Sequence, residues 1–393
     1  ENVAMGAYAL DANTTGDTNT ALGMYSLTGN TTSDGNTGVG YIALGANTTG
    51  AANTAVGAYA LDANTTGQYG VAVGSYALSA NTTGHYNTAI GKNTLLVNTT
   101  GANNTALGTY ALDVNTTASN NTGLGYSALG ANTTGSENVA VGGGVLGANT
   151  TAASNTGMGY GALAANTTGV ANVAVGTYAL DANTTASNNT GLGYAALGAN
   201  TTGAGNTSVG ALALDANTTA NYNVAVGQAA LGASTEGDNN VAIGAFSLDS
   251  NTTADNNTAV GYSALTANTT GTRNSALGAY ALDQSTTAVD NTAMGYQTLG
   301  EITTGAYNTG YGSYALNKTT TASNNTAVGY SALEANTTGT NLVAVGKQAL
   351  LANTTGSSNV AVGNSALAAS TTGDNNTALG HSALLSHTTG GSN

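Results

Sequence analysis

Side chains that could carry out acid–base, nucleophilic or metal chemistry are few in this chain of 393 residues. It has no Cys and three His, namely His85, His381 and His387, and no pair of them has the spacing of metal ligands. No Ser lies in a Gly-x-Ser-x-Gly elbow supported by a His and an acid. The glycine-rich stretch around Gly142 lacks the Lys or Arg that a phosphate-binding loop would need. The sequence therefore predicts neither an enzyme nor a tightly bound cofactor.

Carboxylates are more regular, because many of them recur in a fixed register along the chain. One such set is Asp11, Asp62, Asp113 and Asp181. A closer pair, Asp17 and Asp34, is separated by a single interval of this register. Paired acids can hydrolyse glycosidic bonds, but a pair without a surrounding cleft is more typical of a solvated rim or a weak Ca²⁺ site. We interpret these acids as a solvated rim, with Asp17 and Asp34 as candidates for weak calcium binding.

The interval from Asp17 to Asp34 belongs to the whole chain. The stretch from Asn13 to Gly16 returns at Asn30 and Asn47, and the register holds to the last copy at His387. Residues 1–393 therefore form a single array, 23 copies of a 17-residue repeat followed by the first two residues of another, which opens and closes mid-pattern like a segment of a longer fibre without caps. Such an array predicts a solenoid, in which each repeat stacks as a rung on its neighbour.

Several positions of the repeat hold one residue type. With Glu1 as position 1, position 6 is always Gly, position 10 always Leu and position 14 always Thr, while positions 2 and 13 are mostly Asn. In the first and fourth repeats the structural columns are Gly6, Leu10, Asn13, Thr14, Gly57, Leu61, Asn64 and Thr65. The Gly column indicates a bend that needs positive φ or close backbone approach. The Asn columns suit stacked amide ladders and ordinary turn chemistry equally well.

This pattern predicts an all-β parallel β-solenoid, or β-roll, with one 17-residue repeat per rung. Positions 2–5 suit a short strand and positions 8–10 a second one, as in 53–56 and 59–61. Gly every few residues works against helix, and no Asn-Gly dipeptide marks a hairpin. We expect the Leu61-type and Val56-type columns to form the buried core, worth roughly 1.5–3 kcal/mol per side chain.

Charged residues occur only at positions 1, 7, 11, 12, 15 and 17, so neither face of the first strand carries any. Either the coil is very thin, or the face formed by positions 2, 4 and 6 packs against neighbouring chains. The expected core is small for a chain whose ordering costs about 1–2 kcal/mol per residue, which favours side-by-side association. A net charge of −14 argues against binding nucleic acid or anionic lipid, and no apolar run could span a membrane.

A second period, of two repeats, overlies the first. Position 16 alternates between Ala and Gly from about Asn103 to Gly339, and Tyr alternates between position 8, as in Tyr110, and position 7, as in Tyr126. Duplication of a two-repeat unit would explain this alternation. The alternative is a structural unit of two rungs, with Tyr rings alternating across a shared surface.

The stretch NTAVGAYALDANTTGAANTAVG resembles the shaft repeats of phage tail fibres and related surface fibres. ENVAVG and NNVAIGAFSL are distantly similar to the β-roll head repeats of trimeric autotransporter adhesins, whose usual repeat is shorter. The resemblance covers the entire chain. It implies an extracellular rod of three chains side by side, on a cell surface or virion. Such a homotrimeric shaft would project a receptor-binding tip and could contact a glycan or receptor along its sides.

Ice binding by a β-solenoid is the alternative function. Regular Thr columns on a flat face order water in several such proteins, and Thr14 and Thr15 recur in nearly every repeat. Because adjacent strand residues face opposite ways, the array would combine the Asn13 and Thr15 columns. The 17 Asn-Thr-Thr sequons would also accept glycans in a secreted eukaryotic protein, unless the Asn is buried.

Overall fold

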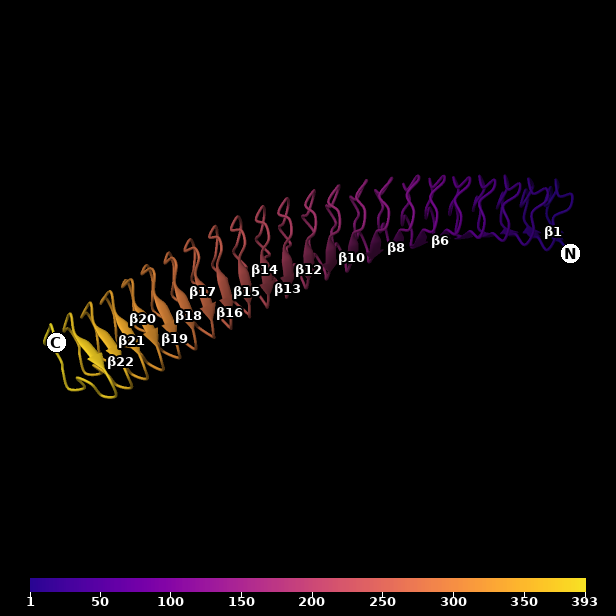
Figure 1. Ribbon diagram of the computed structural model, residues 1–393. Coiled ribbons are helices and arrows are strands. Elements are labelled where there is room, and N and C mark those ends of the chain that lie inside the picture. Colours follow the sequence, from indigo (N-terminus) through magenta and orange to yellow (C-terminus); the bar gives the residue numbers. More distant parts are fainter. The chain divides into compact units, whose positions relative to one another are not determined.

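The structure, a computed structural model, describes residues 1–393 and contains only three-residue β-strands joined by turns. Each strand occupies positions 3–5 of a repeat, and each repeat makes one rung of a coil (Figure 1). Each strand pairs in parallel with the strand one repeat away, so that Val3 lies opposite Thr20 and Thr207 opposite Val224. The prediction of an all-β parallel β-solenoid with one 17-residue repeat per rung is confirmed.

The chain divides into two compact units, Glu1–Ala195 and Ala196–Asn393. The strands of the first unit are β1 (Val3–Met5), β2 (Thr20–Leu22), β3 (Thr37–Val39), β4 (Thr54–Val56), β5 (Val71–Val73), β6 (Thr88–Ile90), β7 (Thr105–Leu107), β8 (Thr122–Leu124), β9 (Val139–Val141), β10 (Thr156–Met158), β11 (Val173–Val175) and β12 (Thr190–Leu192). Those of the second are β13 (Thr207–Val209), β14 (Val224–Val226), β15 (Val241–Ile243), β16 (Thr258–Val260), β17 (Ser275–Leu277), β18 (Thr292–Met294), β19 (Thr309–Tyr311), β20 (Thr326–Val328), β21 (Val343–Val345), β22 (Val360–Val362) and β23 (Thr377–Leu379).

Each strand ends at the invariant glycine of position 6. Gly57 follows β4 with a φ of +138°, which an L side chain rarely adopts. A Cβ built on Gly57 would lie 2.6 Å from the carbonyl oxygen of Gly74 on the next rung. Both conditions therefore hold at this column: positive φ, and backbone of the adjacent rung too close for any side chain.

The prediction of a second strand at positions 8–10 is wrong, because these residues form turns. Tyr59 and Leu61 both have left-handed backbone, with φ of 57° and 50°. The Leu of position 10 has this conformation in every rung, with φ between 49° and 55°. Left-handed backbone costs about 1–2 kcal/mol per residue, and burial of a Leu side chain at roughly 1.5–3 kcal/mol offsets it. Leu61 is 1% exposed.

The prediction that the Val56-type column belongs to the buried core is also wrong. Val56 is 37% exposed and points outward from β4, whereas Ala55 beside it is fully buried. Alternation along a strand allows only one of these columns inside, and the interior is too thin for two large side chains per rung. Positions 2 and 4 thus face the interior of their own coil, which resolves the two expected options in favour of a thin coil.

Two columns of Asn amides line this interior. Asn64 donates from Nδ2 to Oδ1 of Asn47 one rung away, at 2.8 Å, and to the backbone oxygen of Gly67, at 3.0 Å. The Asn of position 13 therefore takes part both in an amide ladder between rungs and in a turn within its own rung. At position 2, Asn53 donates to the same Gly67 oxygen and accepts the backbone N–H of Gly70. The amides thus satisfy buried backbone groups where the chain turns.

Candidate binding surfaces

The outer face of the sheet is apolar and uncharged in both units. Position 3 places Thr, Val or, once, Ser275 on it, and position 5 places Val, Leu, Ile, Met or, once, Tyr311. In the second unit, Val260, Leu277 and Met294 line a shallow groove of about 250 Å³ on this face. Contiguous exposed apolar surface is typical of interaction sites. We name positions 3 and 5 of all rungs the sheet face.

The Thr hydroxyls of position 14 are used in hydrogen bonds within the coil. Thr14 and Thr65 each donate a hydroxyl hydrogen bond to the backbone oxygen of the Thr one rung on, at 2.9 and 3.0 Å. The expected Asn13-x-Thr15 array fails, because Asn64 and most other members of the position 13 column are fully buried. A buried, hydrogen-bonded amide also cannot accept a glycan in the folded protein.

The amide ladder of position 13 is interrupted only in the second unit. Asn gives way there to Ser234, Ser285, Ile302, Thr319, Ser370 and His387. Seven buried side-chain oxygens lack a hydrogen-bond partner, and all of them lie at position 13 of this unit: Asn217 Oδ1, Ser234 Oγ, Asn268 Oδ1, Ser285 Oγ, Thr319 Oγ1, Asn353 Oδ1 and Ser370 Oγ. Where Ser replaces Asn, the shorter side chain does not donate to the Oδ1 atom of the Asn one rung earlier, and that oxygen has no partner.

The proposed calcium ligands are occupied with backbone groups. Oδ1 of Asp34 accepts the N–H of Asp17 at 2.7 Å, and Oδ1 of Asp17 accepts the N–H of Thr18 at 2.9 Å. The chain contains no group of three or more His, Cys, Asp or Glu that could hold a metal ion. The two acids close turns at position 17, and this geometry provides too few oxygen ligands for Ca²⁺.

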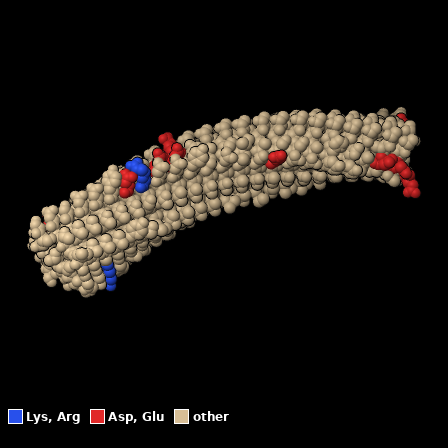
Figure 2. Space-filling model, in the orientation of Figure 1, with Lys and Arg blue, Asp and Glu red and all other residues tan.

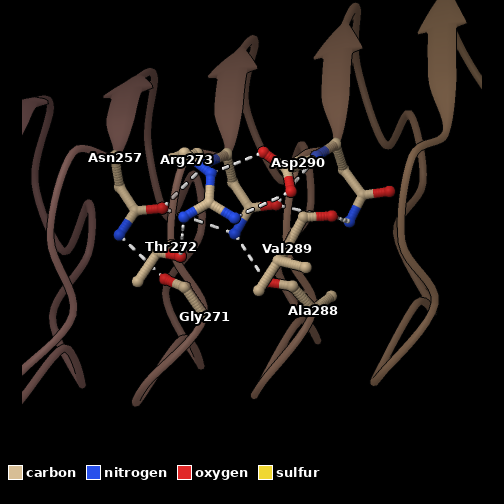
Figure 3. A network of polar contacts seen from close by, with 9 residues as sticks. Asn257, Gly271, Thr272, Arg273, Ala288, Val289 and Asp290 are labelled. Carbon is tan, nitrogen blue, oxygen red and sulfur yellow. Dashed lines mark hydrogen bonds and ion pairs between the residues drawn. The ribbon is translucent and has the colours of Figure 1, made fainter.

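Charged side chains are sparse and scattered over the face shown in Figure 2. Two ion pairs between side chains connect adjacent rungs. Arg273 forms a bidentate pair with Asp290, with Nε–Oδ1 2.7 Å and Nη2–Oδ2 2.9 Å (Figure 3), and Lys318 pairs with Glu301. Both pairs are exposed, so each contributes little to stability.

Position 11 carries half-buried aspartates in six of the rungs. Burial raises the pKa of six of these carboxyls above its ordinary value: Asp62, Asp113, Asp181, Asp215, Asp249 and Asp283. Asp62 also accepts a hydrogen bond from the Ser79 hydroxyl at 2.6 Å, which opposes the rise in pKa without outweighing it. These carboxylates recur every two to four rungs, and Asp62, Asp181 and Asp283 lie near tyrosines of positions 7 and 8.

We expect acidification towards about pH 4.5 to raise the thermal unfolding midpoint relative to pH 7. A carboxyl whose pKa is raised by folding binds its proton more tightly in the folded state, so stability is greatest near and below its ordinary pKa and falls as pH rises through the raised value. Asp17 and Asp290 have lowered pKa values, because of the N-terminal amine and Arg273, and act in the opposite direction. Both lie at the surface, so solvent screens their effect. Replacing the six half-buried aspartates by Asn should flatten the profile, and a midpoint that rises towards pH 7 would contradict the expectation.

Tyrosines at positions 7 and 8 form an aromatic spine along the coil. In the second unit, six rings follow one another edge to face, with centroids 5.4–6.1 Å apart: Phe246, Tyr262, Tyr280, Tyr296, Tyr314 and Tyr330. The two-rung alternation is therefore a structural feature as well as a sequence period. Edge-to-face pairs contribute about 0.5–1.5 kcal/mol each beyond burial.

The spine of the first unit contains a notch of about 430 Å³. Its walls are Tyr126, Tyr160 and Tyr178, and Asp181 lies on its rim. The sequence interpretation considered the nearby glycines only as a phosphate loop and missed this site. The available signal was the absence of side chains at Gly143 and Gly144, the positions 7 and 8 where other rungs carry Tyr.

The chain contains no helix long and apolar enough to cross a membrane. A scan against models of known protein families finds no match, and no curated protein matches the chain.

Proposed function

We propose that this chain is a non-enzymatic structural shaft of an extracellular fibre, on a cell surface or virion, in which three copies lie side by side and project a receptor-binding tip. The uncharged, apolar sheet face carries the proposal. Water-exposed Val, Leu, Ile and Met in nearly every rung would be costly in an isolated chain, and contact with other copies would remove this surface from water. The number three rests on the resemblance to fibre repeats.

The support differs from the sequence expectation in one respect. The sequence offered positions 2, 4 and 6 as a contact face for neighbouring chains, as the alternative to a thin coil, but the side chains of positions 2 and 4 fill the interior. The sheet face on the opposite side of each strand offers the contact instead. Since charges are confined to other positions, no buried charge would oppose association along either unit.

Introducing charge on the sheet face should dissociate the particle without unfolding the coil. The variant carries Val56→Glu, Leu124→Glu and Leu192→Glu, all at position 5. A matched control carries Thr66→Glu, Thr134→Glu and Thr202→Glu, which add the same charge to the same rungs at exposed position 15, where Glu236 occurs naturally. Light scattering should give three chains for the wild type and the control, and one for the sheet-face variant. A monomeric wild type would overturn the proposal.

Ice binding is the second candidate, on a different array from the one expected. The Thr54-type column of position 3 lies exposed or half-exposed on a regular parallel sheet, beside the apolar column of position 5. Thermal hysteresis measured on the same samples separates the candidates. A trimer without hysteresis supports the shaft, whereas a monomer with hysteresis that is lost on charging the sheet face supports ice binding.

A further inference from the structure

The aromatic spine of the first unit has a gap at Gly144. Tyr alternates between positions 8 and 7 through Tyr110 and Tyr126, and again through Tyr160 and Tyr178, but the position 8 residue between these pairs is Gly144. Gly144 has a φ of +66°, close to the 59° of Tyr178 in the same column. A Cβ on Gly144 would meet nothing within 4 Å. The backbone is therefore shaped for a tyrosine, and the missing ring leaves the notch open.

Each ring beside the gap packs against the ring of the rung beyond it. Tyr126 makes an edge-to-face contact with Tyr110, at 6.1 Å and 90°, and Tyr160 does so with Tyr178, at 5.7 Å and 84°. Tyr160 and Tyr178 thus form two perpendicular walls, with Tyr126 as a third wall. Perpendicular aromatic walls enclose a rounded group rather than sandwich a flat one.

The chemistry of the lining favours a cation with few hydrogen-bond donors. Besides the phenols, the only polar side chains are Ser127 and the carboxylate of Asp181, too few to satisfy the hydroxyls of a sugar. Aromatic faces attract quaternary ammonium groups through the ring quadrupole. Asp181 on the rim and the net charge of −14 attract a cation and repel anions.

We propose that the notch between Tyr126 and Tyr160 binds a quaternary or methylated ammonium group, such as the trimethylammonium group of choline. The cation lies among the three rings and above the open backbone of Gly144, with its charge balanced by the carboxylate of Asp181. The notch uses positions 7, 8 and 11, away from the sheet face, so it does not depend on the proposed association of chains.

Calorimetric titration of the full chain with choline tests the proposal, with 3,3-dimethyl-1-butanol as the uncharged analogue of the same shape. Choline should bind at one site, and the analogue at least about tenfold more weakly. Gly144→Tyr restores the missing ring and should abolish binding while the fold is kept, because Tyr occupies this column elsewhere. Ala229→Tyr makes a similar change at position 8 of another rung and should leave binding unchanged. Tyr160→Ala and Asp181→Asn should each weaken binding roughly tenfold.

Three results would overturn the proposal. One is equal affinity for choline and its uncharged analogue, which would show that the notch selects apolar bulk alone. Another is unchanged choline binding in Gly144→Tyr, which would place the site elsewhere. The third is the absence of choline binding at tens of millimolar, whether or not a sugar such as N-acetylglucosamine binds. Each leaves the oligomeric state, and with it the shaft proposal, untouched.

Discussion

Replacing Gly125 by Ala is expected to destabilise the first unit by about 3 kcal/mol or more, whereas the same replacement at Gly123 should change its stability by less than about 1 kcal/mol. Gly125, at position 6, has a φ of +135°, and a Cβ there would lie 2.5 Å from the carbonyl oxygen of Gly142. The obstructing atom is backbone of the next rung, so it can move only if the rungs separate. Separation would also break the ladder hydrogen bonds on that side of the coil.

Gly123 is a control in the same rung, two residues away. It occupies position 4, where Ala106 and Ala140 of the adjacent rungs are fully buried without displacing their neighbours. A Cβ on Gly123 would lie 3.3–3.4 Å from Ala128 and Leu112, a tight contact that other rungs accommodate. Thermal and denaturant unfolding followed by circular dichroism would measure both variants. Equal losses at the two positions would show that added volume, rather than φ and backbone approach, limits the glycine column.

The invariant columns allowed the rung to be predicted, but not the path of the chain within it. A 17-residue period with Gly at position 6 leaves little besides a stacked coil. Position 10 is different, since Leu is rarely found with left-handed backbone and nothing in its identity indicates that conformation. The turn at Leu61 persists because the coil buries the side chain completely. This burial depends on the whole closed rung and cannot be deduced from the residue type. Residue propensities alone therefore favoured a second strand at this position.

The sequence analysis also predicted the wrong residues of the strand to face the interior, for a related reason. Strand periodicity shows that Ala55 and Val56 point in opposite directions, but hydrophobicity alone favours burying Val56. The structure buries Ala55, because Leu61 and the two Asn columns already fill a narrow interior. The candidate surfaces follow from this choice. The sheet face exists because the larger apolar residue is outside, and the notch exists because Gly144 leaves a gap between Tyr126 and Tyr160.

The interruptions of the amide ladder indicate where the coil is weakest. In the first unit, Asn132 donates to Asn115 and accepts from Asn149, with both bonds at 2.9 Å. At Ser234 of the second unit the corresponding hydroxyl has no partner, and neither does Oδ1 of Asn217 before it. A buried polar atom without a partner costs about 1–3 kcal/mol. Such defects recur in the second unit, so we expect its amides to exchange hydrogen faster than those of the first.

Exchanging the two residue types should therefore move stability in opposite directions. Ser234→Asn places an amide between Asn217 and Asn251, where it can donate to the first and accept from the second, and should stabilise the second unit by about 1–3 kcal/mol. Asn132→Ser creates the same defect in the first unit and should destabilise it by a similar amount. Hydrogen exchange measured by mass spectrometry on the full chain would localise each change to the mutated rung and its neighbours. The expected result for Ser234→Asn is slower hydrogen exchange around Asn217 and an unchanged exchange rate around Asn132. If Ser234→Asn instead speeds exchange, the rung has closed around the smaller side chain, and the defect is a packing adaptation rather than a missing hydrogen bond.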